Sequence, residues 1–298
     1  MFQESGQPSS FPQQTLSASF TCNGVGLHTG HPVTVQVAPS PVGSGYTFIR
    51  TDLPDFPRIS VGVNQVAQTL LSTRLASGNV TIQTVEHLLA ALIGMGIDNA
   101  SIEVNSDELP LLDGSAQEWV RGITEVGSQI QNGTRPLVWL EESISLQQGD
   151  AIVAAFPADE TRFTYGIDFD SQVIGNQWYS WSPGQQLGDN PVGFAQEIAP
   201  ARTFGLAEQI DGLRAKGLIK GGTLDNALVC NYTNWINPPL RFTNEPVRHK
   251  LLDLIGDLSL LGIPPIAHYF AYKANHGLHV QFAKLLSDNS HRQPLRAV

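Results

Sequence analysis

Apolar and polar residues follow two different periods along this chain. Alternation with a period of two predicts a hairpin from Leu16 to about Val37 and further strands over residues 45–53, 58–66 and 99–105. A helical spacing of apolar residues predicts a helix over residues 85–95, with Thr84 as its N-cap and glycines near its end. A second helix is predicted over residues 115–127.

The same order of elements returns in the second part of the chain. Strands are predicted around residues 137–158 and 162–170, then a helix over 247–261, a strand over 266–273 and a final helix over 277–288. Both parts therefore run strands, helix, strand, helix. This order predicts a duplicated α+β unit, although no residue-level repeat accompanies it.

Polar and turn-forming segments mark the expected boundaries. Residues 1–14 are rich in Gln, Ser and Pro and predict a disordered lead-in. Residues 128–136 contain Asn-Gly and Pro and predict a linker, so we expect domains at 15–130 and 137–298. Residues 205–229 predict an insert with its own helix and strand.

Composition narrows the class of protein. The 298 residues include 41% hydrophobic residues, enough for a substantial core, and the net charge of −10 argues against nucleic-acid binding, which depends on neutralising phosphates. The two cysteines form no CxxC pair, which argues against a disulfide framework and favours a reducing compartment. No run approaches the ~20 apolar residues of a membrane helix, and no secretory signal is evident. We expect a cytoplasmic protein without a transmembrane segment, and a monomer.

The candidate chemistry starts with a polar stripe on an apolar helix. His249, Asp253 and Asp257 are spaced i, i+4 and i+8, so they share one helical face, while leucines and an isoleucine cover the other. Buried charges need partners, and this stripe predicts contact with a metal ion or water. A single His-x-x-x-Asp is more often a surface pair.

Glu86 and His87 lie in the other strongly apolar helix. A catalytic zinc takes three protein ligands and leaves one position open, so His249 and Asp253 need a third ligand, for which His87 is the best candidate. The site would then lie between the two halves. Glu86 diverges from His87 by about 100° on the helix and would reach a water molecule as general base. The alternative for Glu86 is an ordinary acidic residue at a helix N-terminus.

Further candidates come from loops. His276 follows a predicted strand and suits an acid–base role, with Asp257 holding its cation, although a helix-capping or exposed His is the commoner explanation. The other candidates are weaker when taken singly: His28 in a Gly-rich turn, Thr203 and Phe204 beside Arg202, and Lys250.

Taken together, these motifs resemble the UDP-3-O-acyl-N-acetylglucosamine deacetylase family, the zinc amidases of the committed step in lipid A biosynthesis. The resemblance spans about Gln14 to Ser287 in the expected order. It is carried by residues 24–30, 84–92, 97–116, 201–205, 240–262 and 273–277.

The resemblance implies a role for most of these residues. Zn²⁺ would be held by His87, His249 and Asp253. Glu86 would be the general base and His276 the general acid, with Asp257 orienting it. Thr203 would stabilise the tetrahedral intermediate, and Lys250 and Phe204 would contact the UDP-acyl-sugar substrate. His28 is a further substrate-binding candidate because its Gly-rich turn could approach a phosphate. The implied fold has two similar β-α-α-β halves, with helices packed between two sheets and one insert in each half.

Three departures from the family pattern accompany the match. Ala274-Asn275 replaces the usual Ser-Gly before the acid histidine, and His279 replaces an Asn that is often found three residues after it. The loop over residues 70–79 lacks the cysteine that some members carry near the metal.

Three hypotheses remain at this point. The first is zinc-dependent hydrolysis of the N-acetyl group of the UDP-linked sugar. The second is a zinc amidase acting on a different acylated sugar. The third is a carbohydrate- or nucleotide-binding protein with a structural metal, which the adjacent Glu86 and His87 disfavour because a structural site needs no such carboxylate.

Overall fold

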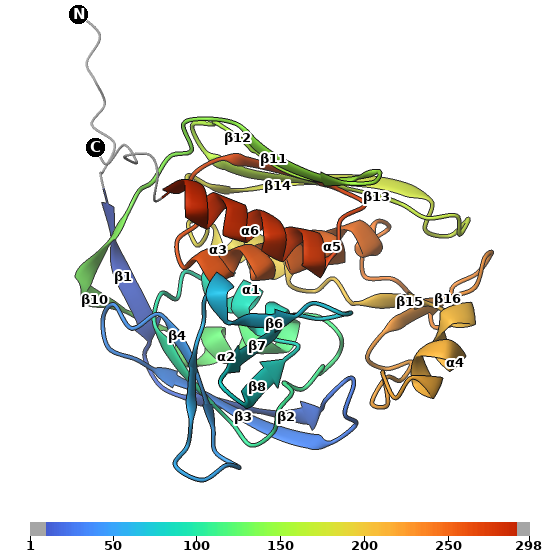
Figure 1. The fold of residues 1–298 in the computed structure, drawn as a ribbon, viewed down its shortest axis with the longest axis horizontal. Helices are drawn as coiled ribbons and strands as arrows, with labels where there is room; N and C mark the ends of the chain where they lie inside the picture. Colours follow the sequence, from blue (N-terminus) through green and yellow to red (C-terminus); the bar gives the residue numbers. More distant parts are fainter. Residues whose placement is uncertain (1–9, 291–298) are drawn as a thin grey trace, which may run out of the picture.

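The computed structural model describes residues 10–290 and has two five-stranded sheets as its outer layers (Figure 1). In the first sheet the strand order is β2-β3-β9-β4-β5, and only β4 and β9 run parallel. Its strands are β2 (Phe20–Val25), β3 (Pro32–Pro39), β4 (Tyr46–Arg50), β5 (Arg58–Ser60) and β9 (Ala100–Val104).

The second sheet repeats this arrangement. Its order is β11-β12-β17-β13-β14, and again only the pair formed by the third and fourth strands in this order, β17 and β13, is parallel. Its strands are β11 (Ile144–Gln148), β12 (Ala151–Phe156), β13 (Thr161–Asp168), β14 (Asn176–Gly184) and β17 (His268–Tyr272). The predicted duplication of an α+β unit is therefore confirmed at the level of topology.

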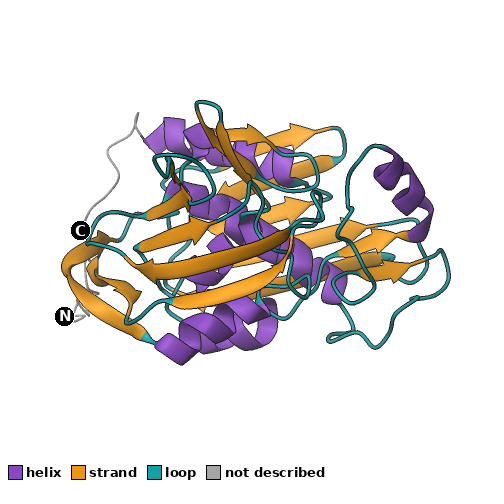
Figure 2. Cartoon of the chain, turned by 90° about the horizontal axis from the view of Figure 1, so that it is seen from below, coloured by secondary structure: helices purple, strands orange, loops and turns teal. Residues whose placement is uncertain are grey.

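Helices from both halves fill the space between the sheets, as expected for the α+β sandwich (Figures 1 and 2). They are α1 (Glu86–Gly94), α2 (Gln117–Val126), α5 (Glu245–Leu258) and α6 (His276–Ser290). Every residue of α1 is buried, because this helix is covered on all sides. Helix α2 instead keeps one polar face exposed.

Each half carries an insert. In the first half it is a small sheet of β6 (Val66–Gln68), β7 (Arg74–Ser77) and β8 (Val80–Gln83), preceded by η1 (Val63–Gln65). In the second half, β15 (Phe204–Leu206) and β16 (Leu228–Cys230) pair in parallel around α4 (Ala207–Ala215), which agrees with the predicted insert. The remaining short segments are α3 (Pro191–Gly193), η2 (Phe194–Ile198) and η3 (Ser259–Leu261).

A two-stranded ribbon corrects two expectations about the chain boundaries. The segment expected to be a linker is strand β10 (Ser128–Pro136), and it pairs antiparallel with β1 (Ser10–Leu16). The expected disordered lead-in reached Gln14, whereas β1 begins at Ser10; residues 1–9 lie outside the described residues. Both segments are polar, and the two strands that pair are more than 100 residues apart in the sequence. Neither segment therefore shows the local hydrophobic pattern from which a strand is predicted.

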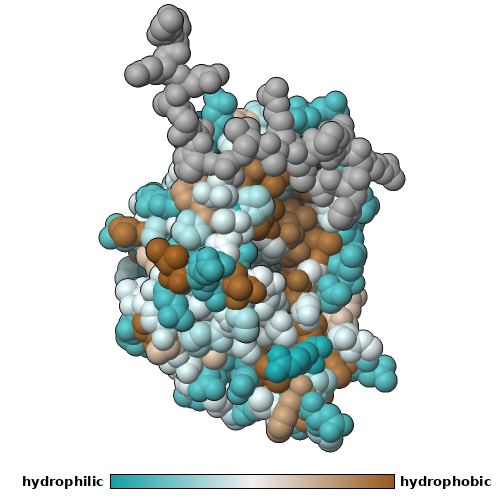
Figure 3. Space-filling model, turned by 90° about the vertical axis from the view of Figure 1, so that its left-hand side faces the viewer, coloured by the Kyte–Doolittle hydropathy of each residue, from teal (hydrophilic) through white to brown (hydrophobic). Residues whose placement is uncertain are grey.

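The ribbon is fastened to both halves through Arg135 on β10. Its Nη1 atom lies 3.4 Å from Asp98 Oδ1 in the first half and 3.4 Å from the Leu187 carbonyl oxygen in the second. Figure 3 views the molecule from this side and shows scattered apolar patches among hydrophilic ones. Within residues 10–290, no helix combines the length and the apolar character needed to cross a membrane.

Candidate active site

The candidate site lies where α1 of the first half packs against α5 of the second half. The two helices approach closely because α5 has a glycine at the contact. A Cβ atom at Gly256 would lie 2.2 Å from the carbonyl oxygen of Glu86, which is far inside van der Waals contact. The first turn of α1, with Glu86 and His87, is thereby pressed onto the polar stripe of α5.

His87, His249 and Asp253 converge at this contact, each no more than 5% exposed. Asp253 Oδ1 lies 3.7 Å from His87 Nε2 and 3.4 Å from His249 Nε2. The two imidazole rings are nearly perpendicular, at 87°. The predicted meeting of these three side chains from opposite halves is observed.

This group fits a divalent metal ion. Its three ligand atoms lie within 4.8 Å of one another, and tetrahedral coordination with bonds of about 2.0–2.2 Å places ligand atoms roughly 3.3–3.6 Å apart. Asp253 Oδ1 is buried without a hydrogen-bond partner among the described residues, as expected of an atom reserved for a cation. Three ligands leave one coordination position open.

The electrostatics of the group favour its metal-binding protonation state. Burial lowers the pKa of His249 to about 4, so its ring is neutral at pH 7, and Nδ1 donates to the carbonyl oxygen of Ala201. Burial opposes ionisation of Asp253, but Lys250 and His249 outweigh it and hold its pKa well below the ordinary value. Lys250 Nζ donates to Asp253 Oδ2 at 2.8 Å.

A second cluster surrounds Asp257, one turn further along α5. Its Oδ2 accepts from His276 Nδ1 at 2.8 Å, and its Oδ1 accepts from the Thr73 hydroxyl at 2.6 Å. Burial disfavours the His276 cation, but Asp257 and Asp253 together raise the pKa of His276 to about 9. His276 is therefore an imidazolium at neutral pH, with Nε2 3.8 Å from Asp253 Oδ2.

Glu86 is buried near both clusters, and Thr73 connects it to Asp257 in the second one. The Thr73 backbone N–H donates to Glu86 Oε2 at 3.0 Å. Burial raises the pKa of Glu86, against the attraction of His276 and His87. The expected N-cap role of Thr84 is wrong, because its φ is 59° and its hydroxyl donates to Glu108 instead.

Two residues near His276 that differ from the family pattern, Asn275 and His279, make hydrogen bonds that define their roles. Asn275 Oδ1 accepts from the Leu278 backbone N–H, which caps the start of α6. His279 is fully buried, and its Nδ1 donates to Asp257 Oδ2 at 2.9 Å. Its Nε2 lies 2.9 Å from the hydroxyl of Tyr165. His279 thus shares one carboxylate oxygen with His276 and extends the network into the sheet.

The remaining candidates lie around the same centre. The Phe204 ring meets the His249 ring edge-on at 6.4 Å, and His28 Nε2 lies 3.4 Å from Ser72 Oγ, next to Thr73. The Thr203 backbone N–H donates to the carbonyl oxygen of Gly114, which holds its loop against the first half. No described contact joins the Thr203 hydroxyl to the metal group.

Sequence reasoning missed two residues that shape the site. Thr73 bridges Glu86 and Asp257, and Glu108 accepts from the backbone N–H groups of His28 and Thr29. Neither residue belongs to a spacing pattern, because their partners are distant in sequence. Glu108 can be recognised only from the structure, where its side chain is 0% exposed, which is unusual for an acidic residue.

Comparison with known proteins gives a consistent result. Residues 13–288 match the profile of the family described as UDP-3-O-acyl N-acetylglycosamine deacetylase. A protein from Nostoc sp. named UDP-3-O-acyl-N-acetylglucosamine deacetylase is 59% identical over 91% of this chain and 97% of its own length. One of the same name from Thermosynechococcus vestitus is 50% identical, covering 92% and 94%. An Arabidopsis thaliana protein named as a probable mitochondrial form is 42% identical, covering 94% and 89%.

Proposed function

The chain belongs to the UDP-3-O-acyl-N-acetylglucosamine deacetylase family, and we propose from this premise how its residues act. It is a deacetylase that hydrolyses the N-acetyl group of UDP-3-O-acyl-N-acetylglucosamine and releases acetate, a step of lipid A biosynthesis. One observation carries the assignment of the site. Three buried side chains that could hold a metal ion lie beside the buried carboxylate of Glu86 and the buried His276, whose pKa is raised to about 9.

The metal in this proposal is Zn²⁺, held by His87, His249 and Asp253. When bound, it polarises the substrate carbonyl and makes water a better nucleophile. Two imidazole nitrogens and one carboxylate oxygen match the ligand types that catalytic zinc prefers. The neutral state of His249 leaves its Nε2 lone pair available.

Glu86 and His276 move the protons in this proposal. Glu86 accepts a proton from the attacking water, and its raised pKa makes the carboxylate a stronger base than an exposed glutamate. His276 has its Nδ1 proton committed to Asp257, and its Nε2 lies 3.8 Å from Asp253 Oδ2, so the Nε2–H would be the proton available to the reacting amide. That N–H first stabilises charge on the carbonyl oxygen and then protonates the departing nitrogen as the C–N bond breaks.

The other residues bind or orient the substrate. Thr203 would add a donor to the carbonyl oxygen of the tetrahedral intermediate. Phe204 would pack on the sugar or the acyl chain beside the metal group, and Lys250 and His28 would contact polar parts of the nucleotide sugar. Asp257 keeps His276 charged and oriented.

The proposal places the enzyme in the cytoplasm. Cys22 and Cys230 are both free thiols, which is the usual state in a reducing compartment. A binding protein with a structural metal, the third hypothesis, would need neither a buried base nor a buried imidazolium next to the ligands.

The test is an acetate-release assay on the UDP-acyl sugar with metal content measured in parallel. Glu86→Gln should retain the metal, because Glu86 is not a ligand, and should lose at least 10²-fold in kcat. His87→Ala should lose the metal. Near-normal turnover of Glu86→Gln would remove the base assignment, and a full metal content in His87→Ala would remove the ligand assignment.

A further inference from the structure

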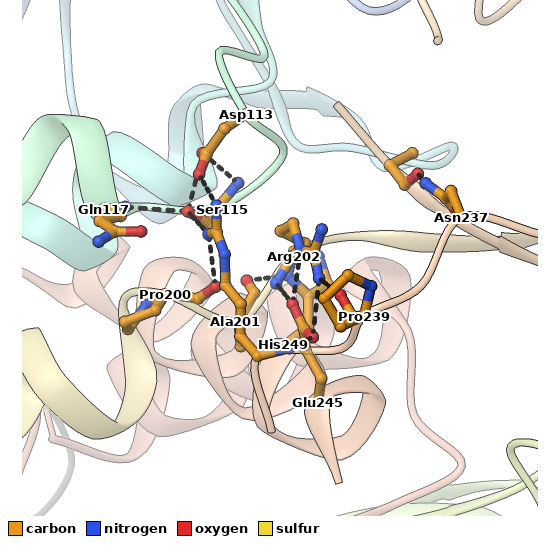
Figure 4. Close-up of polar contacts among 12 residues, drawn as sticks. Asp113, Ser115, Gln117, Pro200, Ala201, Arg202, Asn237, Pro239, Glu245 and His249 are labelled. Carbon is orange, nitrogen blue, oxygen red and sulfur yellow. Dashed lines mark hydrogen bonds and ion pairs between the residues drawn. The ribbon is translucent and has the colours of Figure 1, made fainter. Parts of the chain in front are cut away.

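A buried carboxylate that the mechanism does not use lies one helical turn before His249. Glu245 is the first residue of α5 and is 0% exposed. Its Oε1 accepts from the backbone N–H of Arg202 at 3.0 Å and from Arg202 Nε at 2.8 Å. Its Oε2 accepts from Arg202 Nη2 and from the Arg241 backbone N–H (Figure 4).

The contact with the Arg202 N–H connects Glu245 to the metal group. His249 Nδ1 donates to the carbonyl oxygen of Ala201 at 3.0 Å. That carbonyl and the Arg202 N–H are the two ends of one peptide unit. The Glu245 carboxylate therefore accepts a hydrogen bond from the N–H of the same amide whose carbonyl oxygen accepts one from His249 Nδ1 (Figure 4).

We infer that Glu245 is a positioning residue that strengthens metal binding by His249 through the Ala201–Arg202 peptide. Hydrogen bonds arranged in a chain polarise one another, so an amide whose N–H faces an anion has a stronger acceptor oxygen. A stronger acceptor at Nδ1–H fixes the tautomer of the ring and makes Nε2 more basic. Histidine ligands commonly receive this support from a carboxylate directly; here one peptide lies between them.

The competing explanation is that Glu245 only anchors the loop. Arg241 also bridges the halves, since its Nη2 donates to Asp113 Oδ2 at 2.7 Å and its Nη1 donates to the Pro200 carbonyl oxygen. Loss of an anchor would lower stability without a specific effect on the metal. Asp113 belongs to the same cluster but its hydrogen bonds go to Arg241 and Ser115 rather than to the Ala201–Arg202 peptide, so Asp113→Asn is the matched control.

The experiment rests on the proposed metal site and uses the full chain stripped of metal. Zn²⁺ is titrated against a competing chelator into the wild type, Glu245→Gln and Asp113→Asn, with thermal unfolding of each variant measured in parallel. Glu245→Gln should bind Zn²⁺ 10–100-fold more weakly, the effect typical of losing such outer support. Asp113→Asn should bind within about twofold of wild type, and the His249 Nδ1–H proton resonance should move only in Glu245→Gln.

Wild-type affinity in a folded Glu245→Gln would overturn the inference, as would an equal loss of affinity in Asp113→Asn. If Glu245→Gln fails to fold, Arg202→Lys decides, because it keeps the backbone N–H and the charge. Retained Zn²⁺ affinity in Arg202→Lys supports the relay, and a tenfold loss overturns it. Absence of Zn²⁺ binding by the wild type would instead refute the proposed function.

Discussion

Gly256→Ala tests whether the contact between α1 and α5 sets the metal geometry. The added Cβ would meet three backbone atoms of Glu86, its carbonyl oxygen at 2.2 Å, its carbonyl carbon at 2.9 Å and its Cα at 3.1 Å. No flexible side chain can give way, so the first turn of α1 must move relative to α5.

The size of the movement follows from the geometry. Ordinary contact begins at 3.4 Å, which is 1.2 Å beyond the 2.2 Å that the new Cβ would have (3.4 − 2.2). His87 is the next residue after Glu86 and shifts with it, so the 3.7 Å separation of His87 Nε2 and Asp253 Oδ1 widens. Overpacking of this kind costs about 1–3 kcal/mol of stability. Metal–ligand distances in a well-formed site lie within about 0.2 Å of their standard values. Metal affinity should therefore fall, by about 10–100-fold if the loss matches that of removing an outer support.

The assay combines thermal unfolding with Zn²⁺ titration. Gly212→Ala is the control, because Gly212 lies within α4 and its Cβ would meet nothing within 4 Å. That variant should gain about 0.5–1 kcal/mol and bind metal as the wild type does. A Gly256→Ala protein with wild-type stability and wild-type affinity would refute the proposed role of this helix contact.

Two further predictions concern Asp257 and the metal. His276 acts as an imidazolium, so activity exists below its pKa of about 9 and is lost as pH rises through that value. Asp257→Asn removes a carboxylate that raises this pKa, so it should move the alkaline limb of the kcat/KM–pH profile to lower pH. An alkaline limb that does not move would contradict this role of Asp257. Chelation should lower the melting temperature, because metal at 100 times its Kd contributes about 2.7 kcal/mol to folding, whereas calorimetry of His87→Ala should show no response to chelator.

Local spacing was enough to predict part of the site. The i, i+4, i+8 spacing on α5 placed His249, Asp253 and Asp257 on one face, and the structure confirms it. The apolar surroundings of His87 correctly indicated a buried helix. The strand–helix order likewise predicted the repeated halves, because it depends on local periodicity.

What the sequence could not predict depends on contacts between distant residues. Thr84 has the composition of an N-cap, but its bond to Glu108, 24 residues away, holds it at positive φ. The segment containing Asn-Gly and Pro reads as a linker until its pairing with β1 is known. Thr73 lies in a loop with no pattern, and its link to Asp257 spans 184 residues.

The β1–β10 ribbon has a consequence for how molecules reach the reaction centre. The crossing between halves is a strand paired with β1, and its Arg135 contacts both halves, which opposes a hinge motion at this crossing. Arg135 lies near the far end of α1, whose nine residues separate it from the first turn by about 13 Å. We therefore expect the substrate to reach the first turn of α1 without passing this ribbon.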